Sequence, residues 1–334
     1  MKAVYIKEFG GAENLEIRAV ENPPKPKDKQ VLVNIKASAV NRADILQRKG
    51  FYAAPNGVSN EILGLEFAGK VSEIGENVSD FKTSDRVFGI TAGAAQAEFL
   101  LTEESLLAHI PDNLSFTDAA AIPEAFITAH DAVFTQAKLQ KGESLLIHAV
   151  GSGVGLAALQ LAKAKGAKVF GTSRTAEKLT KCDAFGLDHG IVTGGNAVKD
   201  NPKIFAELPE YFTGGKGIDV ILDLVGADYF AANLESLALK GRLILVGLVG
   251  GRTAEFNLGL ALTKRLKITG TVLRSRSTKE KAEATANFIA DVLPLLESGK
   301  VKPNIDKVFP IEEIGKAHEY VESNESFGKV VLEF

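Results

Sequence analysis

The chain has 334 residues, of which 39 are Lys or Arg and 42 are Asp or Glu, so its formal charge is −3. With 45% hydrophobic residues and 32 glycines, the composition excludes a disordered or collagen-like chain. The near-neutral charge argues against nucleic-acid or membrane-surface partners. The single cysteine, Cys182, excludes an intrachain disulfide and a cysteine-rich metal site. The length predicts two domains, and we expect a cytoplasmic protein because no apolar run approaches the ~18 residues of a membrane span.

The N-terminal third of the chain is typical of a compact all-β unit, because short β-branched segments are separated by turns such as Gly10-Gly11. One helix is predicted there, at Asn41–Lys49, with Asn41 as its N-cap. The predicted strands are Lys2–Lys7, Leu15–Val20, Val31–Val40, Phe67–Ile74, Arg86–Ile90 and Ala97–Thr102.

From Lys141 onward, apolar strands alternate with helices, which predicts an α/β region with a doubly wound parallel sheet. The predicted strands are Ser144–Val150, Lys168–Ser173, Gly190–Thr193, Ile218–Val225, Arg242–Val249 and Leu266–Leu273. The predicted helices are Val154–Lys165, Thr175–Phe185, Pro202–Phe212 and Asp228–Leu239.

The C-terminal tail is too short for a third domain, so we expect it to pack on one of the other two. Its predicted elements are a helix at Thr278–Ser298, a strand at Lys307–Pro310, a helix at Glu312–Ser323 and a strand at Lys329–Phe334.

A glycine-rich turn joins the first strand and helix of the α/β region. After Leu145–Val150 the chain reads Gly151-Ser152-Gly153-Val154-Gly155 and enters the helix. Small residues let a pyrophosphate approach the backbone, and N–H groups at a helix start favour an anion. The strict G-x-G-x-x-G spacing is broken, because Val150 and Ser152 replace the first two glycines. A packing turn without a nucleotide would look similar, and Ser152 suits both phosphate binding and helix capping.

The end of the next strand bears on cofactor preference. Where an NAD site places an acidic residue, this chain has Ser173 and Arg174, followed by Lys178. A hydroxyl and cations match a 2′-phosphate, so NADPH is predicted over NADH. The alternative is that these are ordinary solvated residues.

Several longer motifs, in order along nearly the whole chain, resemble the zinc-independent quinone oxidoreductases of the medium-chain dehydrogenase/reductase superfamily. The motifs are Ala37–Asp44, Ile62–Gly69, Ala121–Ala125 with Thr128-Ala129, Ile147–Gly155, Leu273–Arg276 and Gly328–Leu332.

This resemblance implies a Rossmann doubly wound domain inserted in a GroES-like β-rich catalytic domain. The catalytic domain is expected at 1–125 and 271–334, and the NADP-binding domain at 126–270. It also implies a homodimer through the edge of the nucleotide-domain sheet, with Leu266–Leu273 as the candidate strand.

The residues themselves argue against zinc. Alcohol dehydrogenases of the superfamily place Cys where Asn41 stands and His where Leu65 stands. Neither an amide nor an isobutyl group replaces those ligands, and the four-cysteine structural site is impossible with Cys182 alone.

The resemblance also implies the functional residues. Asn41, Asp44, Tyr52 and Thr128 are expected around the nicotinamide and the substrate opening. Helix capping remains an alternative for Asn41 and Asp44, and a loop position for Tyr52. The expected cofactor-binding residues are Gly151, Ser152, Gly153, Val154, Ser173, Arg174, Lys178, Thr193, Gly247, Leu248, Val249, Leu273 and Ser275.

Three further residues bear on the site or on the scaffold around it. A close family relative has an aromatic residue where Thr193 stands, which leaves adenine stacking open. Glu124 fits either the site or the scaffold, and His148 is expected to be a hydrogen-bonded scaffold histidine.

Without a metal or a flavin, the predicted chemistry is direct hydride transfer from NADPH to a quinone, an acceptor that is already electron-poor. A residue such as Tyr52, or a water ordered by Asn41, is expected to contact the quinone oxygen. The alternative is reduction of a C=C bond conjugated to a carbonyl, in a 2-alkenal, enone or enoyl thioester. A non-catalytic crystallin-like or RNA-binding role is less favoured.

Overall fold

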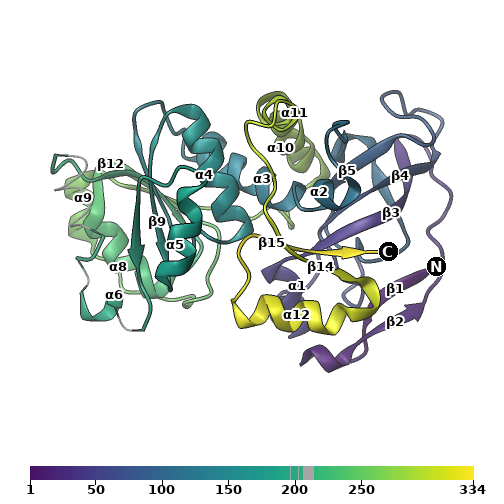
Figure 1. The fold of residues 1–334 in the computed structure, drawn as a ribbon, viewed down its shortest axis with the longest axis horizontal. Coiled ribbons are helices and arrows are strands. Elements are labelled where there is room, and N and C mark those ends of the chain that lie inside the picture. The colour runs from purple at the N-terminus through teal and green to yellow at the C-terminus, as the bar shows by residue number, and fades with distance from the viewer. Residues whose placement is uncertain (196, 202, 206–213) are drawn as a thin grey trace. The chain divides into compact units, whose positions relative to one another are not determined.

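The structure is a computed structural model that describes residues 1–195, 197–201, 203–205 and 214–334. The chain divides into two compact units (Figure 1). Unit 1 comprises Met1–Ile127 and Leu273–Phe334, and unit 2 comprises Thr128–Val272. No helix in the described ranges is both long and apolar enough to cross a membrane.

Unit 1 is built on a mostly antiparallel sheet with the strand order β14-β15-β3-β4-β5-β7, in which β6 also pairs with β3. Its strands are β3 (Gln30–Val40), β4 (Glu66–Ile74), β5 (Arg86–Ile90), β6 (Phe99–Glu103), β7 (Leu107–His109), β14 (Ile305–Pro310) and β15 (Lys329–Glu333). A separate antiparallel pair is formed by β1 (Lys2–Ile6) and β2 (Leu15–Ala19). Because β15 pairs with β3, the tail packs on the N-terminal unit (Figure 1).

Two apolar cores hold unit 1 together. One lies where α12 meets the sheet and includes Val4, Ile45, Val321 and Val330. The other lies within the sheet around Phe67. The helices of unit 1 are α1 (Arg42–Arg48), α2 (Phe116–Ala120), α10 (Thr278–Asp291), α11 (Leu293–Glu297) and α12 (Ile314–Ser323), and α3 (Pro123–His130) contains the boundary to unit 2.

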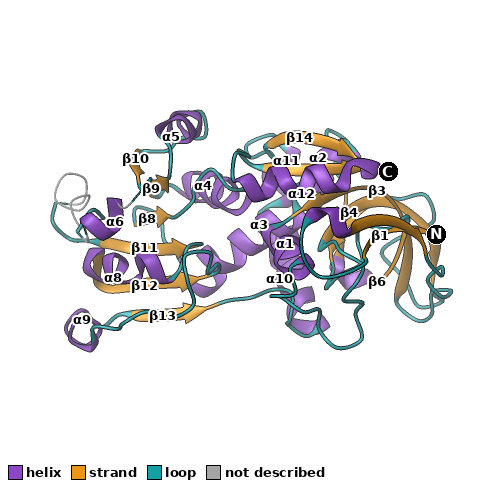
Figure 2. Cartoon of the chain, turned by 90° about the horizontal axis from the view of Figure 1, so that it is seen from below, coloured by secondary structure: helices purple, strands orange, loops and turns teal. Residues whose placement is uncertain are grey.

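Unit 2 holds a parallel sheet whose strand order, within the described residues, is β10-β9-β8-β11-β12-β13. Figure 2 shows these strands one below another in that order. Numbered along the chain this is 3-2-1-4-5-6, the order of dinucleotide-binding sheets. The strands are β8 (Ser144–Ile147), β9 (Lys168–Ser173), β10 (His189–Val192), β11 (Ile218–Asp223), β12 (Leu237–Leu245) and β13 (Lys267–Gly270). The predicted doubly wound fold is confirmed.

The strands of unit 2 are apolar because both faces of the sheet are covered. Leu145, Leu146 and Ile147 of β8 have no exposed surface. The helices of unit 2 are α4 (Gly153–Lys165), α5 (Ala176–Asp183), α6 (Ala197–Asp200), α8 (Ala227–Ser236) and α9 (Leu258–Lys264), with a π-helix at Asp131–Gln136.

Two predicted helices end differently in the structure. The helix predicted at Asp228–Leu239 ends at Ser236, and β12 begins at Leu237, earlier than the predicted strand Arg242–Val249. The Lys264 ammonium donates hydrogen bonds to the carbonyl oxygens of Leu234, Glu235 and Leu237. These bonds satisfy the last carbonyl groups of the helix, so the helix ends there. The helix predicted at Thr278–Ser298 breaks at Val292, because Pro294 lacks the N–H that would continue it.

Other boundaries were also wrong. The strand predicted at Ala97–Thr102 is Phe99–Glu103, and α2 and α3 were not predicted. Most of the helix predicted at Pro202–Phe212 lies outside the described residues.

Candidate functional site

A buried ion pair with an amide lies inside unit 1. Lys329 Nζ of β15 lies 2.6 Å from Glu66 Oε1 of β4 and 2.6 Å from Asn41 Oδ1. Asn41 Nδ2 donates to the same Glu66 oxygen at 2.8 Å, which closes a triangle. Strand β3 ends just before Asn41 and pairs with both β4 and β15, and this pairing brings the three residues together. Glu66 and Lys329 are buried, so each charge is balanced by a partner rather than by water.

Asp44 lies beside this triangle with no exposed surface. Its Oδ2 accepts the Asn41 N–H at 2.8 Å, and its Oδ1 accepts the Gly64 N–H at 3.0 Å. Gly64 has φ +104°, and a Cβ there would lie 2.5 Å from the Gln96 nitrogen, so this position requires glycine. Burial raises the pKa of Asp44 to about 6, although these two N–H groups oppose the shift.

Glu124 reaches the same group from the start of α3. Its backbone N–H donates to Glu66 Oε2 at 2.8 Å. Burial, and then the neighbouring Glu66 carboxylate, raise the pKa of Glu124 to about 8, although Lys329 and Arg274 oppose the shift. Glu124 therefore holds its proton more tightly than an ordinary carboxyl group.

Arg274 fixes a loop against this group of residues. The side chain is 4% exposed, and it donates to Ala92 O at 2.7 Å, to Tyr52 O at 3.2 Å and to Gln47 Oε1 at 2.6 Å. Its guanidinium also lies 5.1 Å from the centroid of the Tyr52 ring. Burial raises the pKa of the Tyr52 phenol, although the Arg274 charge opposes this. The loop that follows α1 is thus held by one buried cation.

The structure brings together three of the four residues expected at the catalytic site, namely Asn41, Asp44 and Tyr52. Asn41 is also the N-cap of α1, as its alternative interpretation predicted. Its amide is bonded to Glu66 and Lys329, and the Asp44 carboxylate accepts the Asn41 N–H as part of a capping box. Thr128 lies on α3 within unit 2 and is partly buried.

Sequence reasoning did not select Glu66 or Lys329 as site residues, and it named Arg274 only within the stretch Leu273-Arg274-Ser275 that was expected to contact the cofactor. The available signal was a charged residue inside an apolar segment, since Glu66 lies between Leu65 and Phe67 and Lys329 precedes three apolar residues. Charged residues in such positions are rarely buried unless they are paired.

In unit 2 the strands end at a common edge, and the strand order reverses between β8 and β11. Ligands of such sheets bind at this reversal. Helix α4 begins here at Gly151-Ser152-Gly153-Val154, and Ser152 Oγ accepts the Gly155 N–H at 3.1 Å. Ser152 therefore caps the helix, and its hydroxyl proton remains available to an anion. The remaining N–H groups of the first turn have no intrahelical acceptor, which suits a pyrophosphate.

The residues expected to bind the 2′-phosphate lie at the same edge of the sheet of unit 2. Ser173 ends β9, Arg174 follows with an exposed side chain, and Lys178 lies one turn further in α5. Thr193 follows β10, and its Oγ1 donates to Ser173 O at 3.2 Å. The hydroxyl of Tyr229 in α8 hydrogen-bonds to the Thr193 side chain, so an aromatic ring lies beside Thr193 although none stands at that position.

A buried polar network fixes this edge. Asn233 Nδ2 donates to Asp223 Oδ2, so Asn233 Oδ1 accepts from His148 Nε2 at 2.6 Å. Thr172 Oγ1 accepts the Ala149 N–H and lies 3.1 Å from His148 Nδ1, to which it donates. Burial lowers the pKa of His148, so the ring is neutral. His148 is a scaffold residue, as the sequence predicted.

The remaining expected cofactor residues fall in both units. Gly247, Leu248 and Val249 follow β12 at the sheet edge of unit 2. A Cβ at Gly247 would lie 2.6 Å from Leu224 O, so only glycine fits there. Leu273 and Ser275 lie in a turn of unit 1, where Leu273 is buried and Ser275 is exposed.

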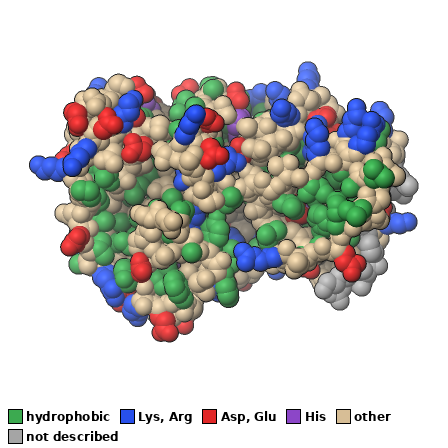
Figure 3. All heavy atoms as spheres, turned by 180° about the vertical axis from the view of Figure 1, so that it is seen from behind, with side chains coloured by type: hydrophobic (Ala, Val, Ile, Leu, Met, Phe, Trp, Pro, Cys, Tyr) green, Lys and Arg blue, Asp and Glu red, His purple; other side chains and the backbone are tan. Residues whose placement is uncertain are grey.

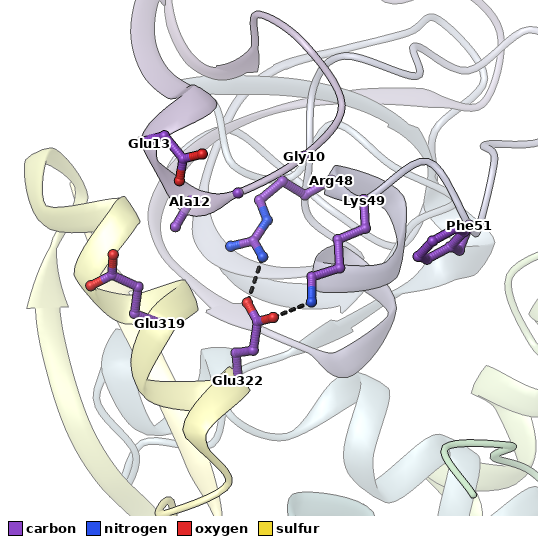
Figure 4. A pocket seen from close by; sticks show the side chains of 9 residues that line it. Gly10, Ala12, Glu13, Arg48, Lys49, Phe51, Glu319 and Glu322 are labelled. Carbon is purple, nitrogen blue, oxygen red and sulfur yellow. Dashed lines mark hydrogen bonds and ion pairs between the residues drawn. The ribbon is translucent and has the colours of Figure 1, made fainter. Parts of the chain in front are cut away.

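A separate hollow of about 490 Å³ opens elsewhere in unit 1 and contains none of these residues. Glu322, one of the residues that line the hollow, forms ion pairs with both Arg48 and Lys49 (Figure 4). The lining residues are Gly10, Gly11, Ala12, Glu13, Arg48, Lys49, Phe51, Glu319 and Glu322.

The side chains of the candidate site do not suit zinc. The Asn41 oxygen is occupied by the Lys329 ammonium, and a second cation there would be repelled. Over the described part of the chain, no group of three or more His, Cys, Asp or Glu side chains is arranged to hold a metal ion.

Comparisons with known proteins agree with this architecture. Residues 27–131 match the alcohol dehydrogenase GroES-like domain, and residues 153–290 match the zinc-binding dehydrogenase domain. Human quinone oxidoreductase is 33% identical over 99% of this chain and 97% of its own. Among solved structures, a mycobacterial protein complexed with NADPH has a TM-score of 0.87 and 28% identity, with full coverage of both chains. The CurK enoyl reductase has a TM-score of 0.86 and 27% identity, over 99% of this chain and 98% of its own.

Proposed function

Because the chain belongs to the zinc-independent quinone oxidoreductases of the medium-chain dehydrogenase/reductase superfamily, we propose that it is an NADPH-dependent quinone reductase. The observation that carries the proposal is the group of paired charges in unit 1, in which Lys329 is bonded to Glu66 and Asn41, together with a dinucleotide-binding sheet in unit 2. Bound NADPH supplies a hydride, so neither a metal nor a flavin is required.

The cofactor is proposed to lie along the carboxyl edge of unit 2. The first turn of α4 would hold the pyrophosphate, and Gly247 would let the backbone approach the cofactor. Ser173, Arg174 and Lys178 would hold the 2′-phosphate, which favours NADPH over NADH. Tyr229 is added as a candidate wall for the adenine, because it lies beside Thr193.

The substrate is proposed to contact residues of unit 1 whose polar groups can still donate a hydrogen bond. The Tyr52 hydroxyl is a candidate donor to the oxygen of the acceptor, and Arg274 positions its loop. Asn41 and Asp44 would act by holding the Glu66–Lys329 pair and the turn at Gly64 in place. Thr128 remains a predicted contact.

The proposal is tested by following NADPH oxidation at 340 nm with 1,2-naphthoquinone and 1,4-benzoquinone as acceptors, with NADH in parallel. We expect quinone-dependent oxidation, with kcat/KM for NADPH at least about tenfold above that for NADH, as one charge-assisted contact gives. NADPH binding without oxidation by any acceptor contradicts the proposed activity.

Reduction of a conjugated C=C bond is the second candidate. It is favoured by the similarity to the CurK enoyl reductase and needs no metal. Adding 2-hexenal and crotonyl-CoA to the same assay separates the two activities. Turnover of these acceptors alone would assign the protein to the second activity.

We further propose a homodimer formed through β13. This strand is the last in the sheet order, and the apolar side chains of Leu258, Leu262 and Val272 near it are 71%, 79% and 47% exposed. Figure 3 shows hydrophobic side chains gathered on the face of unit 2 where β13 and α9 lie. The cytoplasmic location stays a prediction.

A further inference from the structure

Unit 1 holds a third carboxyl group, that of Glu124, whose role in the reaction rests on the proposed function. Three acidic side chains lie close together in unit 1, and in two of them both carboxylate oxygens already accept hydrogen bonds. Both oxygens of Asp44 accept backbone N–H groups, and both oxygens of Glu66 accept hydrogen bonds, from Lys329 and Asn41 on one side and from the Glu124 N–H on the other. Within the described residues, the structure gives the Glu124 carboxyl group no hydrogen bond or ion pair. Of the three acids, Glu124 is thus the one whose carboxyl group can take part in a proton transfer.

Titratable and charged groups from several elements act on Glu124. Acidic groups are Glu66 of β4 and Asp44 of α1, and the neighbouring phenol is Tyr52. Cationic groups are Lys329 of β15, Arg274 of the turn before α10 and Lys281 of α10. Burial and the Glu66 carboxylate, which accepts the Glu124 backbone N–H, both disfavour a negative charge on Glu124, so this carboxyl group holds its proton more tightly than an ordinary one.

The reaction needs one proton. A hydride that reaches a quinone leaves a hydroquinone monoanion, and a hydride on the β carbon of an alkenal leaves an enolate. Reduced nicotinamide is the two-electron donor in both cases, and one proton completes the product.

We propose that Glu124 delivers this proton. The O–H bond of its carboxyl group breaks, its electron pair stays on the carboxylate, and a new O–H bond forms on the hydroquinone or a new C–H bond on the enolate. Water then returns a proton to Glu124. The nearby cations Lys329, Arg274 and Lys281 stabilise the carboxylate between these two steps.

The test compares Glu124→Gln, which keeps the shape of the protonated acid, and Glu124→Asp with the wild type. Glu73→Gln is the control, because Glu73 is an exposed glutamate on the same strand as Glu66. Rates are measured from pH 5 to pH 9 with NADPH and either 1,4-benzoquinone or 2-hexenal, at saturating acceptor.

For the wild type and Glu73→Gln we expect kcat to fall above pH about 8. Glu124→Gln should lower kcat at pH 7 at least about tenfold, lose this pH dependence and keep its KM for NADPH. Glu124→Asp should recover part of the rate and of the pH profile. A Glu124→Gln enzyme that keeps both the wild-type rate and its pH profile overturns the proposal.

A second readout does not depend on turnover. Urea unfolding of the wild type and Glu124→Gln is compared between pH 5 and pH 9. Because the folded carboxyl group holds its proton more tightly than the unfolded one, the wild type should lose stability relative to the variant as pH rises through about 8. A constant difference overturns the proposal, since Glu124 then holds no proton in this range. Absence of wild-type turnover would instead refute the proposed function, and the donor role with it.

Discussion

At the scale of single residues, unit 1 depends on charges that have been removed from water and paired. Glu66 has no exposed surface, and its carboxylate accepts from Lys329, from Asn41 and from a backbone N–H. A buried pair adds little net stability, but removal of one partner strands the other charge. This asymmetry makes the pair sensitive to single substitutions.

Lys329→Met should lower the free energy of unfolding by about 3–5 kcal/mol, because it leaves the Glu66 carboxylate buried without a counter-ion. Lys316→Met is the matched control, since its exposed pair with Glu313 contributes less than about 1 kcal/mol. Urea denaturation of both variants measures the difference. Equal losses of unfolding free energy in the two variants would show that the buried pair contributes no more than the exposed one. Glu66→Gln in the Lys329→Met background should restore part of the lost unfolding free energy.

The second residue-scale prediction concerns Asp44. Its pKa rises from 3.8 to about 6 on folding, so the folded chain binds this proton more tightly and stability falls as pH rises from 4 to 6. The stability of the wild type relative to Asp44→Asn should therefore decline by about 2 kcal/mol between pH 4 and pH 7. Denaturation curves at both pH values test this, with the exposed Asp112→Asn as control. A pH-independent difference would contradict the raised pKa.

Arg174 allows the coenzyme preference to be measured directly. Arg174→Ala should raise the Kd for NADPH about 10- to 100-fold and leave that for NADH within about twofold, because only NADPH carries the 2′-phosphate. Quenching or enhancement of nicotinamide fluorescence on titration gives both constants. The exposed Lys165→Ala is the control, and parallel losses for the two coenzymes would remove Arg174 from the phosphate site.

At the scale of elements, the close approach of α4 to the end of β8 sets the backbone geometry at the carboxyl edge of the sheet of unit 2. A Cβ at Gly155 would lie 2.6 Å from the carbonyl oxygens of both Ala149 and Val150. The glycine is thus required by packing, although two other glycines of the familiar motif are replaced. The helix start can therefore hold its position without the full motif.

Gly155→Ala should destabilise the protein by about 2–3 kcal/mol and weaken NADPH binding, because the helix must move away from the strand. Gly315→Ala in α12 is the control. There a Cβ meets only Ala12 O at 3.5 Å, and the helix should gain about 0.5–1 kcal/mol. Thermal unfolding together with NADPH titration distinguishes the two, and a neutral Gly155→Ala would refute the steric argument.

At the scale of the whole molecule, the proposed assembly depends on β13, which is the last strand of its sheet among the described residues. The Thr271 N–H donates to Leu245 O, so strand alternation directs the Gly270 N–H toward the open edge. Gly270→Pro removes this donor and should shift the protein from dimer to monomer in sedimentation velocity. Gly270→Ala, whose Cβ meets nothing within 4 Å, should remain dimeric. A dimer that persists in Gly270→Pro would place the interface elsewhere.

The sequence by itself determined the fold class, the parallel sheet and the first turn of α4, because these follow from periodicity and from local spacing. It also identified Asn41 and Asp44 as neighbours, since they lie three residues apart at one helix start. Helix ends were predicted less well where a distant side chain such as Lys264 terminates the helix.

Only the tertiary structure revealed the group around Glu66, Lys329 and Arg274. Lys329 Nζ and Glu66 Oε1 meet although 263 positions separate the residues, because β3 pairs with both of their strands. The pKa of Glu124 has the same origin, since it is set by burial and by a carboxylate from another strand. Local sequence carries no record of such neighbours, because a charge is buried or paired only by what the rest of the chain places around it.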